Sequence, residues 1–171
     1  PRSYRHISNY EKEILELKAQ GLTRKEIGAL HKYPNLLNRE FEAERPNQKW
    51  VTDISYIPTA QGNCYLSVIR DLYDNSIVSY QMQKYEVKLV LDTNKKAIKK
   101  ENVTAELQLH SDQGSQYVSH DYFVTTQSYG ITPSTSRRGN PYDNALAENF
   151  FSILKMEYIR IHQLLQQLPY S

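Results

Sequence analysis

The sequence contains a single cysteine and no long run of apolar residues. Cys64 cannot form a disulfide within the chain, which favours a reducing cytoplasm, and we interpret it as a small strand residue. No stretch approaches the roughly 18 apolar residues of a membrane-spanning helix, and the N-terminus lacks the apolar core of a signal peptide. We therefore expect a globular cytoplasmic protein with no membrane partner and a single main core.

Neither sign of charge dominates overall, since 21 Lys and Arg stand against 19 Asp and Glu, a formal net charge of +2. The distribution is uneven, because residues 1–49 hold 10 Lys and Arg against 7 Asp and Glu, a net charge of +3. A DNA-contacting element at the front would gain from this excess. An ordinary solvated surface would show the same excess, so charge alone does not establish DNA binding.

Two short helices are predicted at the front of the chain. Ser8 and Thr23 are each followed three residues later by a glutamate, the spacing of a capping box, and Gly21 separates the two helices. This pattern indicates either the opening of a helix-turn-helix unit or a simple helical hairpin. In the first case Arg24 and Lys25 are the predicted DNA contacts.

The segment after these helices does not predict a complete helix-turn-helix DNA-binding unit. Pro34 interrupts it, so we expect no third, recognition-type helix. The polar residues 38–49 are interpreted as a linker. The predicted organisation is a helical segment at 1–37, a linker at 38–49 and a main domain at 50–171.

The main domain alternates between strand and helix patterns. Apolar and β-branched stretches predict strands, and spacings of three and four predict helices. The predicted strands are 50–57, 64–73, 76–83, 105–112 and 131–136, and the predicted helices are 86–100, 119–128 and one starting near Asp143. Short turns make the first three strands antiparallel, which indicates a mixed α/β sheet flanked by helices.

Three acids occupy positions where a carboxylate is costly to bury. Asp53 lies within an apolar strand, Asp112 ends a later strand, and Glu148 lies on an apolar helix. Carboxylates held together need cations, and oxygen ligands without a His or Cys cluster favour Mg²⁺ or Mn²⁺. Such a site suits two-metal displacement at a phosphodiester. The spacing of Asp112 and Glu148 alone is a weak motif, because 19 acids give such pairs by chance.

Three blocks carry a family resemblance: WVTDISYI, LHSDQGSQY and RRGNPYDNALAENFFSILKMEY. Each resembles a catalytic block of the bacterial insertion-sequence transposases with a retroviral-integrase-like core, the frameshift-fusion group. The resemblance implies a ribonuclease-H-like fold with a five-stranded mixed sheet. It implies that Asp53, Asp112 and Glu148 form a metal-binding catalytic triad holding two Mg²⁺ or Mn²⁺ ions. A generic ribonuclease-H-like nuclease is a rival that the third block disfavours.

The same resemblance assigns DNA contacts and partners. Arg137 and Arg138 would form a cationic loop at the DNA, with Asn144 and Lys155 on the helix of Glu148; solvent-exposed basic residues are the alternative. The implied partners are element-end and target DNA, bound by a homo-oligomer in the bacterial cytoplasm at the nucleoid.

Other residues near the three blocks have simpler interpretations. His110 is interpreted as packing rather than ligating metal, and Trp50 as core. Tyr117 either stacks on a base or packs under the loop.

The leading hypothesis is therefore DNA strand cleavage and strand transfer. Compared with the family, the sequence is short before the core, after Lys155, and between its third strand and the next helix. It is thus expected to be a truncated copy. The alternatives are a catalytically inactive DNA-binding product that inhibits a full-length relative, and a remnant without function.

Overall fold

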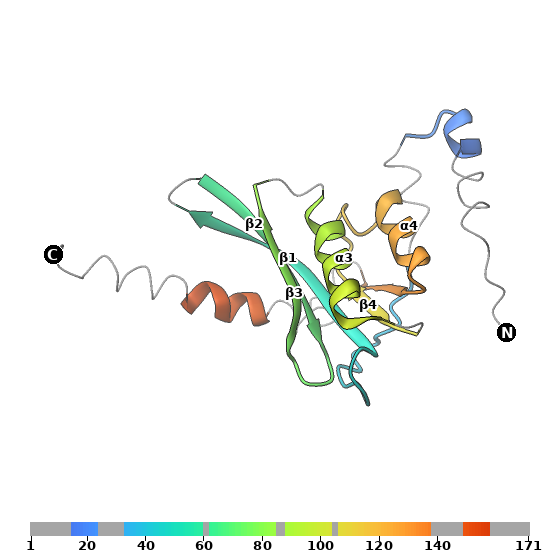
Figure 1. Ribbon diagram of the computed structural model, residues 1–171. Helices are drawn as coiled ribbons and strands as arrows, with labels where there is room; N and C mark the ends of the chain where they lie inside the picture. The colour runs from blue at the N-terminus through green and yellow to red at the C-terminus, as the bar shows by residue number, and fades with distance from the viewer. Residues whose placement is uncertain are drawn as a thin grey trace.

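A five-stranded mixed sheet forms the centre of the computed structural model, which describes residues 15–23, 33–59, 62–84, 88–103, 106–137 and 149–157. The strands lie in the order β3-β2-β1-β4-β5 (Figure 1). Neighbours among β1, β2 and β3 are antiparallel, whereas β4 is parallel to β1, and β5 to β4. The predicted mixed sheet is confirmed. Its strands are β1 (Lys49–Thr59), β2 (Gly62–Asp71), β3 (Ile77–Gln83), β4 (Gln108–Ser111) and β5 (Thr132–Thr135).

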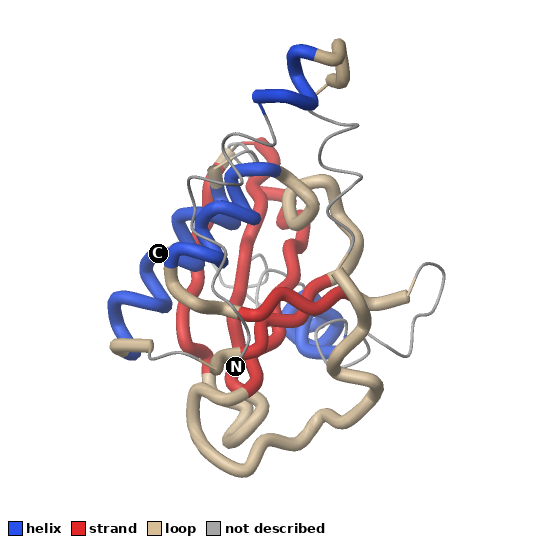
Figure 2. Tube along the Cα trace, turned by 90° about the vertical axis from the view of Figure 1, so that its right-hand side faces the viewer, coloured by secondary structure: helices blue, strands red, loops and turns tan. Residues whose placement is uncertain are grey.

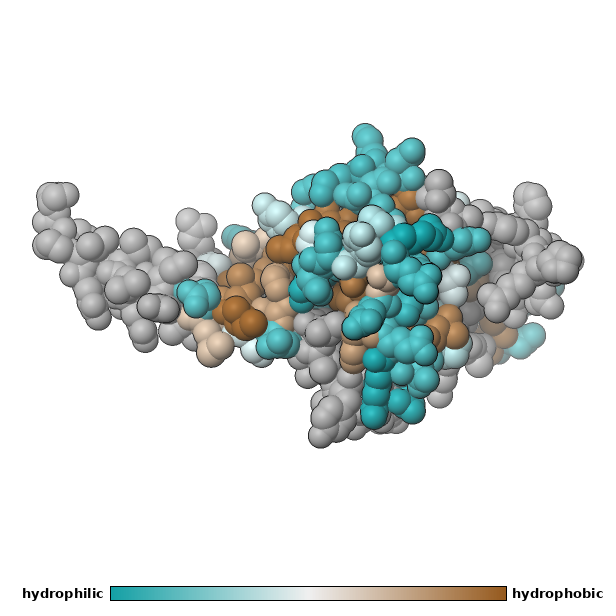
Figure 3. All heavy atoms as spheres, turned by 90° about the horizontal axis from the view of Figure 1, so that it is seen from below, coloured by the Kyte–Doolittle hydropathy of each residue, from teal (hydrophilic) through white to brown (hydrophobic). Residues whose placement is uncertain are grey.

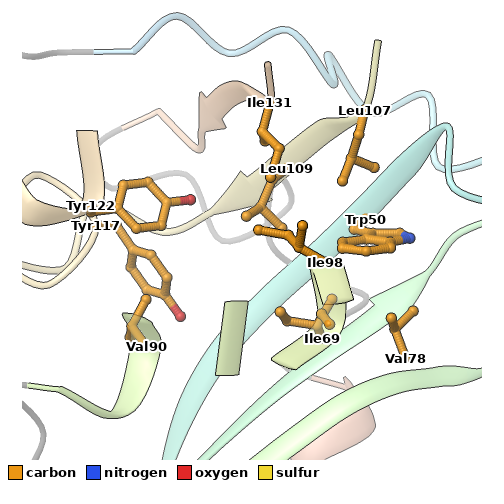
Figure 4. Close-up of a cluster of buried hydrophobic side chains, with 11 residues drawn as sticks. Trp50, Ile69, Val78, Val90, Ile98, Leu107, Leu109, Tyr117, Tyr122 and Ile131 are labelled. Carbon is orange, nitrogen blue, oxygen red and sulfur yellow. The ribbon is translucent and has the colours of Figure 1, made fainter. Parts of the chain in front are cut away.

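Two helices, α3 (Leu89–Glu101) and α4 (His120–Ser128), pack on one face of the sheet (Figure 2). Helix α4 begins where the hydroxyl oxygen of Ser119 accepts a hydrogen bond from the backbone N–H of Tyr122. Helix α3 ends at Asn102, which takes the left-handed conformation with φ 49°. Figure 4 shows the core beneath them, in which Trp50 is 1% exposed, as predicted.

The opposite face of the sheet is covered in part by a helical segment at 149–157. Phe151 is buried there against Ile57 of β1 and Leu66 and Val68 of β2. The other side of the segment leaves Ile153 and Met156 exposed, and Figure 3 shows apolar atoms gathered in this region. The helix of the third sequence block is therefore attached to the sheet through Phe151.

The chain before β1 lies against the core. Leu37 is 1% exposed and packs with Val51 of β1 and Leu72. The backbone N–H groups of Leu36 and Leu37 donate to the hydroxyl oxygen of Ser134 on β5, at 2.9 and 3.3 Å. Residues 33–40 are not helical. The boundaries proposed for the N-terminal segment and linker stay predictions.

The front of the chain is described only at residues 15–23, where 15–19 are helical. Gly21, with φ +86°, ends this helix: its N–H bonds to Lys18 O, and the N–H of Leu22 bonds to Leu17 O. These are the two bonds of a Schellman motif, so the predicted end is confirmed. The second front helix, with Arg24 and Lys25, lies outside the described residues.

Two strands end earlier than the sequence indicates. β2 ends at Asp71, because its carboxylate accepts from the N–H of Tyr73 and of Asn47 and so starts a turn. β4 ends at Ser111, because the Asp112 carboxylate likewise accepts from an N–H two residues on, that of Gly114. In both cases a backbone N–H bonds to an aspartate side chain instead of to a neighbouring strand.

Candidate active site

Asp53 and Asp112 line the same pocket, which has a volume of about 190 Å³. The sheet register explains why. β1 pairs with β4 in parallel from Lys49 with Gln108 to Val51 with His110, and each acid lies two residues beyond the last pair. Neighbouring strands are roughly 5 Å apart, so both acids lie close to the end of this ladder, where they line one pocket. The structure thus brings together two of the three predicted acids, 59 positions apart in the sequence.

The Asp112 carboxylate is held by the turn that follows β4. Its Oδ1 accepts a 2.9 Å hydrogen bond from the backbone N–H of Gly114. A Cβ atom at position 114 would lie 2.9 Å from this oxygen and 2.8 Å from Oε1 of Gln116, closer than real Cβ atoms come. A side chain at position 114 would therefore displace the ends of the Asp112 and Gln116 side chains.

The Asp53 carboxylate is held by its own strand, since its Oδ1 accepts a 2.8 Å hydrogen bond from the N–H of Ile54. Asp53 lies opposite Val68 in the β1–β2 ladder, and cross-strand partners share a face. Val68 and Ile57 both pack with Phe151. The side chain of Asp53 accordingly belongs to the sheet face on which the helical segment 149–157 packs.

Tyr117 forms the base of the pocket and is 1% exposed. Its hydroxyl lies 3.4 Å from Oγ1 of Thr52, and its ring packs edge-on against Tyr122. Burial raises the pKa of Tyr117 well above its ordinary value, and the negative charges of Asp53 and Asp112 raise it further. The phenol therefore stays protonated. Because no ring face is exposed, the base-stacking interpretation of Tyr117 is wrong and the packing interpretation is confirmed.

His110 is buried and does not face the pocket. Its Nδ1 lies 2.8 Å from Oγ of Ser134, which confirms the packing interpretation. In the part of the chain that the structure describes, no group of three His, Cys, Asp or Glu residues could hold a metal ion. Glu148, the third predicted ligand, lies outside the described residues.

The predicted DNA contacts are only partly described. Arg137 is exposed and follows Ser136, whose N–H donates to Ser111 O and whose carbonyl accepts from Nε2 of Gln113, both at 2.9 Å. Arg137 thus leaves the fold beside Asp112. Lys155 is exposed on the segment 149–157. Arg138 and Asn144 lie outside the described residues.

Sequence reasoning missed an aromatic pair at the pocket. Tyr56 of β1 and Tyr65 of β2 are cross-strand partners with ring centroids 5.8 Å apart, and both line the pocket. The residue pairing of a hairpin with a two-residue turn could have predicted this pair from the sequence. Two residues separate β1 from β2, and counting back from that turn sets Tyr56 opposite Tyr65.

No helix in the described ranges is long and apolar enough to cross a membrane.

Comparisons with known proteins identify the family. The integrase core domain matches residues 43–141. The chain is 44% identical over 133 residues to the transposase for insertion sequence element IS904 of Lactococcus lactis subsp. lactis (strain IL1403), covering 77% of this chain and 53% of that protein. It spans about half the length of other insertion-sequence proteins that it matches.

Solved structures show the same fold. A chain in the cryoEM structure of the simian T-cell lymphotropic virus intasome with PP2A regulatory subunit B56 gamma matches 75% of this chain and 46% of its own length, with a TM-score of 0.65 and 23% identity. The HTLV-2 integrase catalytic core domain in complex with magnesium, in its trimeric form, matches 74% of this chain and 79% of its own, with a TM-score of 0.55 and 20% identity. The predicted ribonuclease-H-like core is confirmed by this likeness. The chain therefore belongs to the integrase core domain family, and its resemblance to insertion-sequence transposases is confirmed.

Proposed function

We propose that this chain catalyses metal-dependent DNA strand cleavage and strand transfer at insertion-element ends. The observation that carries the proposal is the meeting of Asp53 and Asp112 at one pocket, the first on β1 and the second directly after the adjacent parallel strand β4. Family membership supports the reaction class, a polynucleotidyl transfer. The substrates are element-end DNA and target DNA.

The residues present fit divalent cations. Mg²⁺ is commonly held by one or two carboxylates, with waters and substrate phosphates completing its octahedron. Asp53 and Asp112 supply two carboxylates on an open pocket with no sulfur or imidazole donor lining it. Each carboxylate is oriented by one backbone N–H bond. Two Mg²⁺ or Mn²⁺ ions are the cofactors we propose, and the magnesium-bound HTLV-2 core of the same fold supports this choice.

Helical spacing supports Glu148 as the third ligand. Phe151 packs on the sheet face to which Asp53 belongs, against Ile57 and Val68. A residue three positions before Phe151 on a helix lies on the same side of that helix, one turn earlier. Continuing the helix of 149–157 by one residue would direct Glu148 toward this face of the sheet.

The proposed reaction is an in-line displacement at phosphorus. Bound divalent cations supply the positive charge that stabilises the attacking and leaving oxygens. Asp53, Asp112 and Glu148 would hold those cations in place, and the neutral phenol of Tyr117 adds no negative charge to the pocket. Attack by water cuts the strand, and attack by a 3′-hydroxyl joins it to target DNA.

DNA positioning is proposed for basic residues around the pocket. Arg137 leaves the fold next to the turn that holds Asp112, so a phosphate near the acids lies within its reach. Arg138, Asn144 and Lys155 are proposed to extend this contact, and Arg24 and Lys25 to bind farther along the DNA. We propose that the chain acts as a homo-oligomer on DNA, which the intasome that contains its structural relative supports.

A nicking and strand-transfer assay with Mg²⁺ on element-end DNA tests the proposal. Asp53→Asn, Asp112→Asn and Glu148→Gln are each expected to abolish turnover while keeping the thermal unfolding transition. Asp121→Asn, an exposed acid on α4, is the matched control and should keep wild-type turnover. Wild-type activity in any of the three acid variants would contradict the proposed site.

The inactive DNA-binding product is the other function that this assay separates. It predicts salt-sensitive DNA binding without turnover in the wild-type chain. A chain that neither binds DNA nor turns it over would support the remnant instead.

A further inference from the structure

We propose that Tyr56 and Tyr65 form a stacking site for one unpaired DNA nucleotide beside the catalytic acids. This inference rests on the proposed function, because it names the form of DNA that the same site accepts. It starts from the aromatic pair that the pocket shares with Asp53 and Asp112.

The site exists because β1 is longer than its neighbour β4. β1 runs from Lys49 to Thr59, yet its ladder with β4 stops at Val51. Among the described strands, none pairs with the β4-side edge of β1 beyond that residue. The pocket reaches this edge, where Tyr56 and Tyr65 from one face of the sheet and Asp53 from the other border one open space.

The aromatic pair is accessible at the surface. Tyr56 is 43% exposed, and the two rings meet edge to face at 71°. Edge-to-face contact with Tyr65 favours one tilt of the Tyr56 ring. Ile54 adds an apolar wall. A rigid aromatic surface of this kind binds any base by stacking, independent of sequence.

The size and position of the pocket select an unpaired nucleotide. Its volume of about 190 Å³ is below the roughly 300 Å³ of sites for drug-sized ligands, so it suits a single ring system. Bases inside a duplex are covered on both faces and a terminal pair exposes only its outer face, whereas a frayed or extruded nucleotide presents a single ring system on its own. The acids lie in the same pocket, so the phosphate of that nucleotide would be adjacent to the proposed metal ligands.

The test measures binding rather than chemistry. The full chain is used with Glu148→Gln, which prevents the proposed cleavage, in Mg²⁺ buffer. The probes are two DNA duplexes with 2-aminopurine at the 3′-terminal nucleotide, one with that nucleotide unpaired and one fully paired. Fluorescence quenching on titration gives the affinity for each probe, and thermal unfolding checks the fold of each variant.

We expect the unpaired probe to bind more tightly than the paired probe, by roughly 5- to 100-fold if one base stacks. Tyr56→Ala should remove this preference, and Tyr56→Phe should retain it. Tyr56→Leu, which keeps apolar contact with Tyr65 but has no aromatic face, should also remove the preference, and it serves if the alanine variant fails to fold. Tyr73→Ala, an exposed tyrosine at the opposite end of the β1–β2 ladder, should retain the preference.

A preference that survives both Tyr56→Ala and Tyr56→Leu would overturn the inference. So would equal loss of affinity for both probes, since that indicates a general contact rather than stacking. The outcome is separable from the proposed function. Strand transfer by the wild-type chain with no Tyr56-dependent preference refutes only the stacking site, whereas a Tyr56-dependent preference in a chain without turnover refutes only the chemistry.

Discussion

Ser134→Ala is expected to loosen the attachment of the chain segment before β1 to the sheet. Ser134 is fully buried on β5 and has three partners: the N–H groups of Leu36 and Leu37 donate to its Oγ, and Nδ1 of His110 lies 2.8 Å away. Since Oγ already accepts twice, its hydrogen points to Nδ1. One hydroxyl therefore satisfies three groups from two other parts of the chain.

The magnitude follows from those partners. Removing the hydroxyl leaves three polar groups without that bond, and each loss costs about 1 kcal/mol, so the expected destabilisation is about 3 kcal/mol. For a chain of this length such a change lowers Tm by about 6–12 °C. The volume removed is a single oxygen, so the cost comes from hydrogen bonding rather than from a cavity.

Urea unfolding followed by circular dichroism measures the free energy, and amide hydrogen exchange measures the protection of Leu36 and Leu37. Protection of these two amides should fall more than that of the β1–β2 ladder. Ser128→Ala is the control, because its hydroxyl bonds only to Thr125 O at the end of α4, and it should change stability by under about 0.5 kcal/mol. A loss below about 1 kcal/mol for Ser134→Ala, with protection unchanged, would refute this reasoning.

Three further predictions concern the pocket and the core. Gly114→Ala should lower strand transfer by about 100-fold because its Cβ displaces the Asp112 carboxylate; the exposed Ser115→Ala is the control, and equal rates would contradict the steric argument. Phe151→Ala should cost about 3 kcal/mol in urea unfolding, since it empties the contact with β1 and β2; an unchanged midpoint would show that the segment is not docked in solution. The third prediction concerns alkaline pH, where three tyrosines have pKa values raised by burial: Tyr33, Tyr117 and Tyr122. Above the unfolded pKa of about 10 the unfolded chain releases protons that the folded chain keeps, so stability should fall by about 1.4 kcal/mol per pH unit for each tyrosine. Equal urea midpoints at about pH 9 and about pH 11 would contradict this.

Much of the sheet could be predicted because its strands carry strong local signals. β1, β2 and β3 are β-branched and aromatic with short turns between them, and each was predicted to within a few residues. Boundaries were less predictable where one side chain decides them. The carboxylates of Asp71 and Asp112 each capture an N–H two residues on, and no periodicity in the sequence records that choice.

The residues of the candidate site were likewise only partly predictable from the sequence. Asp53 and Asp112 were identifiable because an acid in an apolar strand is unusual, and the resemblance strengthened them. The connection of Ser134 to His110 and Leu37 was not, because one hydroxyl joins residues 24 and 97 positions away in the sequence. A serine in a polar-looking strand gives no sequence signal of that role. Tyr117 shows the converse, because an aromatic residue near an acid proved to be core.

The parallel pairing of β1 with β4 also sets the order in which the pocket can assemble during folding. β1, β2 and β3 are joined by short connections, so their meander closes small loops. The pairing of β1 with β4 joins Val51 to His110, 59 positions later in the sequence. Closing that longer loop costs more chain entropy. A chain that is still being synthesised and lacks β4 can therefore form the hairpins of β1, β2 and β3. It cannot yet bring the carboxylates of Asp53 and Asp112 together. On the proposed function, metal binding and DNA cleavage would both require the completed sheet.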